Sequence, residues 1–382
     1  FFLGASLLVL LSVTASKISD KFAVPALLFF ILIGMLAGSE GLAGIHFDDL
    51  AFAKDFGIIA LAVIVFTGGI DTNFKDVRSV MGPGILLSTA GILLTTLLVG
   101  VFALFVLKFS LLEGLLLGAI VSSTDAAAVF CVLRTRRVSL KGSLRPLLEF
   151  ESGSNDPMAL FLTIILIRLL QHTIALQDVF PIFIFEMGMG AFIGWLMARG
   201  SLLLIHWLKI ESPGLYPALT LSLLILTYSM TELMHGNGIL AAYVMGLVMG
   251  REEFLHKKAV KQFYEGLAWL VQIAMFLILG LMVVPSHIPG MLPLGLAVAA
   301  FLILVARPLS VLVSLLPFRM GMPKVLMISW VGLRGAAPII LATFPLLAAL
   351  PNAGTIFDIV FIVVLVSILV QGGSVAFVSR LL

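Results

Sequence analysis

The chain has 382 residues, of which 61% are hydrophobic and 11% are charged, and its mean hydropathy is +1.21. Ordinary soluble domains are about half apolar and about a quarter charged, so this composition excludes a soluble globular protein and predicts one polytopic membrane domain. The formal net charge is only +3, and the single cysteine, Cys131, excludes an internal disulfide.

Apolar runs long enough to cross a bilayer recur along the whole chain, separated by short polar breaks. We expect an all-α protein with about thirteen transmembrane helices. They are predicted at residues 1–19, 23–39, 54–71, 81–107, 112–133, 145–170, 178–208, 213–234, 236–251, 264–284, 290–317, 323–350 and 354–382. The segments 23–39 and 236–251 are short for a full span, which predicts that they are tilted or partly re-entrant.

The distribution of Lys and Arg predicts the orientation, because cytoplasmic loops carry an excess of these residues. With the N-terminus outside, the inner loops hold most of them, including basic clusters at 134–145 and 251–261. The outer side then holds only Lys54, Lys108 and Arg168. We therefore expect the N-terminus outside and the C-terminus inside, with the clusters acting as topology determinants or, alternatively, as contacts for lipid headgroups or a regulatory domain.

The two halves of the chain resemble each other in the order of their polar and small residues. Gly34 and Gly38 near the end of 23–39 match Gly246 and Gly250 near the end of 236–251. The same alignment sets T-D-A-A-A, in 112–133, against L-R-G-A-A, in 323–350. We predict a single domain over 1–382 built of two inverted repeats, 1–170 and 213–382, joined by a linker helix at 178–208. Interrupted helices at matching places in such repeats indicate a transport site.

Two segments at membrane depth carry residues that interrupt helices. The first contains Ser122, Ser123, Thr124 and Asp125, whose side chains favour non-helical backbone. A break there would leave carbonyls free to coordinate a cation, and Asp125 would suit an exposed helix N-terminus, either in an ion site or as a buried cap without ion contact.

The second interrupted segment is G-L-R-G at 332–335, followed by Pro338. Its glycines and proline predict a broken helix. Arg334 would then compensate helix C-terminal ends where the two broken segments cross. A structural role and a direct transport role for Arg334 are compatible. We expect crossed discontinuous helices at 112–133 and 323–350.

The segment 145–170 carries the main polar stripe. Glu149, Ser152 and Asp156 share one helix face, and Glu151 and Asn155 share a second. An ionised side chain in hydrocarbon is costly and indicates function by default.

Glu149 and Glu151 need cationic partners or protonation, and Arg307 and Arg334 are the basic residues available at that depth. We expect two structural ion pairs, which leaves Asp156 as the carboxylate without a dedicated arginine. Asp156 can bind a proton or a metal cation, and competition between the two at one carboxylate is the minimal chemistry of exchange.

Other function classes lack their motifs. The sequence contains no Walker A loop, no dinucleotide fingerprint and no H-E-x-x-H. The six histidines fall at helix ends or loops without metal-ligand spacing. We expect neither a cofactor nor a nucleic-acid partner, and we expect a transporter driven by ion gradients rather than an enzyme.

Three segments together resemble a known family over nearly the whole chain. They are S-S-T-D-A-A-A-V-F at 122–130, E-S-G-S-N-D-P at 151–157 and G-L-R-G-A-A-P-I at 332–339. They are similar to the cation/proton antiporter superfamily, in its electroneutral NhaP-type branch, which includes the animal sodium/proton exchangers. The segments 264–280 and 306–311 most resemble the bacterial potassium/proton antiporters.

The resemblance implies a thirteen-helix homodimer in a bacterial inner membrane, with a dimerisation domain and a moving core domain. It implies that Asp156 binds the ion and the proton. The residues that would complete the site by analogy are Thr124, Asp125, Ser152 and Asn155, and the monovalent cation would contact Asp156 and Thr124. The resemblance further implies that Glu151 pairs with Arg307, and Glu149 with Arg334.

The family pattern differs from this chain at one place. Sodium exchangers of this branch often have a carboxylate where this chain has Thr67, which weakens a transfer of sodium selectivity. The subgroup commonly adds a cytosolic regulatory domain after the last helix, and such a domain would lie beyond residue 382.

The prediction is a secondary antiporter that exchanges monovalent cations, K+ preferred, for protons without net charge movement. A Na+/H+ antiporter is the alternative within the class. Two other classes remain as remote alternatives: a passive cation channel, and an intramembrane aspartyl hydrolase with Asp125 and Asp156 as its dyad.

Overall fold

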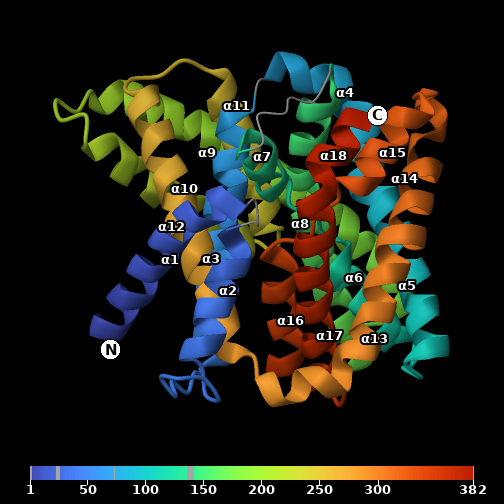
Figure 1. Ribbon diagram of the computed structural model, residues 1–382. Helices are drawn as coiled ribbons and strands as arrows, with labels where there is room; N and C mark the ends of the chain where they lie inside the picture. The colour runs from blue at the N-terminus through green and yellow to red at the C-terminus, as the bar shows by residue number, and fades with distance from the viewer. Residues whose placement is uncertain (1, 23–25, 73, 136–141, 382) are drawn as a thin grey trace.

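The computed structural model describes residues 2–22, 26–72, 74–135 and 142–381, and every regular element in these ranges is helical (Figure 1). The first half contains α1 (Phe2–Phe22), α2 (Ala26–Ala37), α3 (Leu50–Asp71), α4 (Phe74–Leu86), α5 (Ile92–Val106), α6 (Leu111–Ser122), α7 (Ala126–Thr135) and α8 (Leu144–Leu170). Helix α9 (Val179–Leu208) follows. The second half contains α10 (Leu215–Leu233), α11 (Gly238–Arg251), α12 (Lys257–Met282), α13 (Ile288–Phe301), α14 (Arg307–Leu315), α15 (Met322–Trp330), α16 (Ala337–Leu347), α17 (Ala353–Val366) and α18 (Gly373–Leu381).

The membrane helices follow the predicted segments closely. Seven helical stretches in the described part are long and apolar enough to cross a membrane, and shorter apolar helices lie between them. The 12 residues of α2 and the 14 of α11 are only about 18–21 Å long, against a hydrocarbon core of about 30 Å. The short spans expected at 23–39 and 236–251 are therefore confirmed.

The inverted repeat is visible as one helix contact made twice. Helix α2 packs against α12, and α11 packs against α3. A Cβ on Gly34 would lie 2.4 Å from the carbonyl oxygen of Leu277, and one on Gly246 would lie 2.5 Å from that of Phe66. Both crossings thus need a glycine for the backbones to approach so closely. The glycines matched in the sequence occupy equivalent places in the two halves.

A second contact between the two halves joins α5 of the first half to α14 of the second. One wide-turn π-helical segment, Leu87–Gly91, precedes α5, and another, Leu302–Ala306, precedes α14. The hydroxyl of Thr95 donates to that of Ser310 at 2.8 Å, one from each half. Segments of this kind are rare and often mark functional regions. Sequence reasoning did not predict them.

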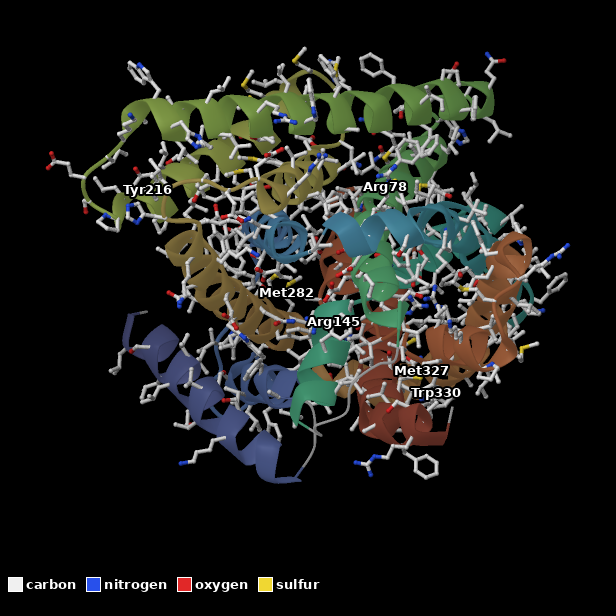
Figure 2. All side chains as sticks on the ribbon, turned by 90° about the horizontal axis from the view of Figure 1, so that it is seen from above. Arg78, Arg145, Tyr216, Met282, Met327 and Trp330 are labelled. Atoms are coloured by element: carbon white, nitrogen blue, oxygen red, sulfur yellow. The ribbon has the colours of Figure 1, made fainter. Side chains whose placement is uncertain are left out.

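Helix α9 runs along one edge of the molecule, as the view from above shows (Figure 2). It packs against α10 and α11. Helix α8 lies in the interior, among α4, α6 and α16. The carboxylates of the predicted polar stripe are therefore carried by a central helix. Of the predicted basic cluster at 134–145, residues 136–141 lie outside the described residues.

Candidate functional site

Two interrupted helices cross at the centre of the protein, as predicted. Helix α6 ends at Ser122 and α7 begins at Ala126, while α15 ends at Trp330 and α16 begins at Ala337. The main-chain N–H of Asp125 donates to the carbonyl of Leu333 at 2.7 Å. The two non-helical links therefore lie side by side and are joined through their backbones.

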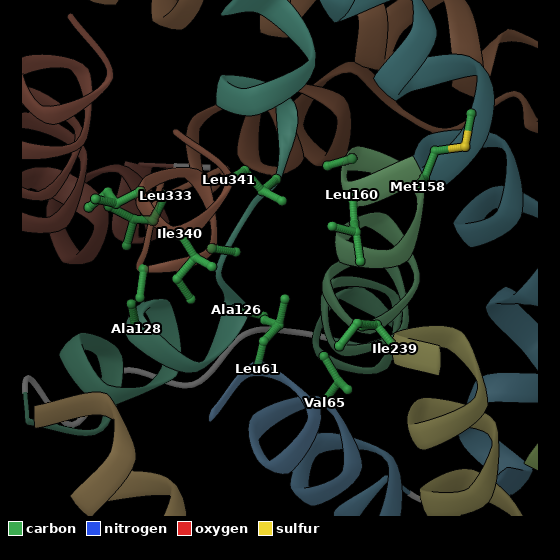
Figure 3. Close-up of a cluster of buried hydrophobic side chains, with 14 of the residues drawn as sticks. Leu61, Val65, Ala126, Ala128, Met158, Leu160, Ile239, Leu333, Ile340 and Leu341 are labelled. Carbon is green, nitrogen blue, oxygen red and sulfur yellow. The ribbon is translucent and has the colours of Figure 1, made fainter. Parts of the chain in front are cut away.

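Apolar side chains surround this crossing. Figure 3 shows Leu61 of α3, Ala128 of α7, Leu160 of α8, Ile239 of α11 and Ile340 of α16 gathered in one cluster. All five are buried. Few water molecules fit among such side chains, so polar interactions at the crossing are stronger than they would be in water.

Arg334 closes the end of α6. Its Nη1 donates to the carbonyls of Ser122 at 2.6 Å and Ser123 at 2.7 Å, and its side chain is buried. These carbonyls belong to the C-terminal end of a helix, where the helix dipole is negative and a cation is favourable. The predicted compensation of a helix C-terminus by Arg334 is confirmed.

Asp125 caps the start of α7. Its Oδ1 accepts the main-chain N–H of Ala128 at 3.0 Å, the geometry of an N-cap. A Cβ on Gly335 would lie only 2.0 Å from Asp125 Oδ2. Because Gly335 has no side chain, the link between α15 and α16 can pass directly over this carboxylate. The expected placement of Asp125 at a helix N-terminus is confirmed.

Asp156, which lies on α8, faces the link between α6 and α7. Its Oδ1 accepts a hydrogen bond from the hydroxyl of Ser123. The Asp156 residue is 7% exposed, so this carboxylate is nearly enclosed. Ser123 was not among the predicted site residues, although it stands in the S-S-T-D run.

The other predicted site residues surround the same link. Ser152 accepts the N–H of Ala126 at 3.1 Å and donates to the carbonyl of Thr124 at 2.9 Å. Asn155 donates from Nδ2 to the hydroxyl of Thr124 at 2.5 Å. In this amide orientation Asn155 Oδ1 is buried and accepts no hydrogen bond from the described residues.

The second link is held in the same manner as the first. The N–H of Arg334 donates to the hydroxyl of Ser367 at 2.9 Å, as that of Ala126 donates to Ser152. Ser367 and Ser152 belong to the last membrane segment of their respective halves. The sequence analysis does not predict Ser367 as part of the site.

Glu151 and Arg307 form a buried ion pair. Arg307 Nη2 donates to Glu151 Oε1 at 2.6 Å, and the two side chains are 2% and 1% exposed. This is the pairing that the family resemblance implied. It connects α8 of the first half with α14 of the second.

The expected pair of Glu149 with Arg334 is wrong. Glu149 accepts from Arg145 Nε at 2.9 Å, one helical turn earlier on α8. Both partners are partly exposed. The guanidinium of Arg334 serves the carbonyls at the end of α6 instead. Because Glu149 lies near the start of α8, it reaches a neighbour on its own helix rather than the central crossing.

Comparisons with known proteins identify the family of this chain. The family model described as sodium/hydrogen exchanger, transmembrane, matches residues 6–381. The chain belongs to the sodium/hydrogen exchanger family. It is thus a multi-pass membrane protein of a transporter family.

Curated relatives in this family carry two kinds of name. The K(+)/H(+) antiporter NhaP of Alkalimonas amylolytica is 43% identical over 98% of this chain and 65% of its own length. The K(+)/H(+) antiporter NhaP2 of Shewanella sp. (strain ANA-3) is 42% identical over 100% of this chain and 67% of its own. The Na(+)/H(+) antiporter NhaP of Pseudomonas aeruginosa is 29% identical over 82% and 78%. The chain spans about two thirds of the length of the first two relatives.

A solved structure has the same fold. The sodium proton antiporter MjNhaP1 from Methanocaldococcus jannaschii superimposes with a TM-score of 0.83 at 25% identity, covering 97% of this chain and 99% of that one. The predicted fold, an all-α polytopic protein with inverted repeats and crossed discontinuous helices, is confirmed.

Proposed function

We propose that this chain is the transmembrane domain of an electroneutral antiporter that exchanges a monovalent cation, K+ in preference to Na+, for a proton. The proposal rests on the partners of three carboxylates on α8. Glu149 has Arg145 and Glu151 has Arg307 as partner, whereas Asp156 accepts from the neutral hydroxyl of Ser123. Asp156 is therefore the group whose charge is left for a proton or a cation to cancel.

The neighbours of Asp156 supply the oxygen atoms that a monovalent cation needs. Ser123 and Thr124 of one link contact the carboxylate of Asp156 and the amide of Asn155, and Asn155 Oδ1 is a buried oxygen without a donor among the described residues. Carboxylate, hydroxyl and carbonyl oxygens suit hard cations. Asp125 and Ser152 shape this link, through the cap of α7 and the bond to the Thr124 carbonyl. In this proposal Glu151 and Arg307 form a structural ion pair that takes no part in the exchange.

The preference for K+ rests on the relatives named K(+)/H(+) antiporter, which are the more similar ones. Thr67, where sodium exchangers often have a carboxylate, donates to the carbonyl of Val63 in its own helix at 2.6 Å. We further propose a homodimer of the bacterial inner membrane, with the N-terminus outside, the C-terminus inside and a moving core domain. A cytosolic regulatory domain beyond residue 382 fits the greater length of the relatives.

The two remote alternatives have less support. A hydrolase dyad needs two aspartates that share one proton, but Asp125 is engaged as the cap of α7 while Asp156 accepts from Ser123. A channel needs a continuous filter, and filters are commonly built by oligomeric symmetry rather than by two crossed, buried links.

The test is cation-dependent proton movement in proteoliposomes that contain a pH-sensitive dye. Addition of K+, Na+ or Rb+ to one side should move protons at once, with the largest response to K+. A channel moves protons only after a proton ionophore compensates the charge, and a hydrolase moves none. Proton movement that depends entirely on the ionophore, or that is absent, would reject the proposal.

A further inference from the structure

A cavity of about 430 Å³ lies between α8, α9 and the turn that joins α10 to α11. On α8 it is lined by Leu160, Ile164 and Arg168, which follow one another at four-residue spacing. Such residues lie near one face of a helix. The same spacing, continued one turn back toward the middle of α8, reaches Asp156. The cavity therefore begins about one helical turn beyond Asp156 along α8.

Asn237 lines this cavity and is bonded to the backbone of α8 next to Asp156. The residue is only 5% exposed. Its Nδ2 donates to the carbonyl of Pro157 at 3.1 Å, and Pro157 directly follows Asp156. A side chain from the second half of the chain is thus bonded to the backbone of α8 beside the site.

The other polar groups of Asn237 fix its position. Its Oδ1 accepts the N–H of Leu240 at 2.9 Å, which makes it the N-cap of α11. Its main-chain N–H donates to the carbonyl of Glu186 on α9 at 2.9 Å. Cap and main chain therefore hold Asn237 on α9 and α11, while its amide nitrogen bonds to α8.

We propose that the hydrogen bond from Asn237 to Pro157 seals this cavity from Asp156, and that it must open for an ion to pass between them. The proposal rests on the proposed function, because it takes Asp156 as the ion-binding group and α8 as part of a moving core. Bonds within α9 and α11 can persist while α8 moves, so the Asn237 to Pro157 bond is the one that motion would break. Asn237 is then a positioning residue of the transport cycle.

The substitution Asn237→Ser separates the two roles of this side chain. Serine is about as good an N-cap as asparagine, so α11 keeps its cap, but its hydroxyl is too short to reach α8 in the same way. Asn237→Asp also keeps the cap and the size while losing the N–H donor. Asn237→Ala loses cap and donor together and should lower the melting temperature below that of both other variants.

The test is the rate at which a cysteine at position 156 reacts with a charged, membrane-impermeant thiol reagent. The protein carries Asp156→Cys and Cys131→Ser, so that position 156 has the single thiol, and the reagent is added to the side on which His172 and His235 lie. This readout does not require transport, so it can succeed or fail independently of the proposed function. Asp49→Ser is the matched control, because it alters the cap of the neighbouring helix α3 and leaves Asn237 intact.

We expect Asn237→Ser and Asn237→Asp to speed the reaction about fivefold. This is the factor by which the loss of one ordinary hydrogen bond raises the population of the open form. Their melting temperatures should stay close to that of the parent, and Asp49→Ser should react at the parent rate. An unchanged or slower reaction in both Asn237 variants would overturn the proposal, as would an equal acceleration in Asp49→Ser.

Discussion

Ser123 connects Asp156 to Arg334 without contact between the two charges. The hydroxyl of Ser123 donates to Asp156, and its carbonyl accepts Arg334 Nη1 at 2.7 Å. The arginine thereby fixes the link that holds the aspartate, while the carboxylate keeps a neutral partner. A direct ion pair would favour the charged carboxylate and hinder its protonation. This arrangement suits a group that alternates between a proton and a cation.

The buried pair of Glu151 and Arg307 should dominate the stability of the central helices. Glu151→Gln leaves the guanidinium of Arg307 buried without its counter-charge, which costs about 3–5 kcal/mol. The melting temperature in detergent should fall clearly, and Arg307→Met added to Glu151→Gln should recover part of the loss. Glu149→Gln is the control, because its partner Arg145 is exposed and such pairs contribute at most about 1 kcal/mol. A Glu151→Gln protein as stable as the parent would refute the structural role of the pair.

Two adjacent glycines of α3 test the contact between the halves. A Cβ on Gly69 would lie 2.8 Å from the carbonyl oxygen of Tyr243 on α11, whereas one on Gly68 meets no heavy atom within 4 Å. Gly69→Ala should destabilise the protein by about 1–3 kcal/mol, as overpacked contacts do. Gly68→Ala should be neutral or slightly stabilising, because alanine favours a helix. Equal melting temperatures for the two variants would contradict the packing of α3 on α11.

A pH-dependent contact joins two loops on one side of the molecule. Glu40 accepts the side-chain hydroxyl of Ser286 at 2.6 Å and its main-chain N–H at 2.7 Å. These two hydrogen bonds lower the pKa of Glu40 below 4.5, its ordinary value. A lowered folded-state pKa contributes stability above the unfolded value, and that stability is lost as the pH falls through the folded-state pKa.

Glu40→Gln should therefore melt below the parent at pH 7, and the difference should shrink as the pH is lowered below 4.5. The measurement is a series of thermal melts of the two proteins across this range. Ser286→Ala keeps the main-chain donor and should show a smaller difference of the same sign. A difference that stays constant with pH would mean that the Glu40 carboxylate does not carry this contact.

Transport should be insensitive to membrane voltage. Glu149 and Glu151 have arginine partners and Asn155 cannot titrate, while the cap of α7 favours the charged form of Asp125. One proton or one cation then cancels the charge of Asp156, so voltage, worth about 2.3 kcal/mol per charge per 100 mV, has no net charge to act on. Voltage set by a thiocyanate gradient, with K+ as the substrate, should leave the rate unchanged. A clear shift would show that a second group titrates, with Asp125 the first to examine.

Much of the site could be predicted because its residues are unusual for a membrane helix. Serine, threonine and aspartate in 122–125, and glycines around Arg334, disfavour continuous helix in any context, and both breaks occur there. The glycines of α2 and α11 were found for the same reason, since close backbone approach leaves no room for a side chain.

The partners of individual side chains were harder to predict. Ser123 turns toward Asp156 from a non-helical link, where no helical periodicity assigns a side chain to a face. Asn237 contacts α8 only through the tertiary fold. Glu149 was different, because Arg145 stands four residues before it and an i, i+4 pair was visible in the sequence. Its expected pairing with Arg334 is wrong because Arg145 is within reach on the same helix, while Arg334 binds the carbonyls at the end of α6.

The most direct test of the account is exchange by Asp156→Asn in proteoliposomes, with K+ added against a pH-sensitive dye. The substitution keeps the size of the side chain and removes its titratable charge, so we predict no cation-dependent proton movement from a protein that melts near the parent temperature. Asp358→Asn, at another aspartate within a membrane helix, should retain exchange. Normal exchange by a well-folded Asp156→Asn protein would contradict the central claim that Asp156 carries the proton and the cation.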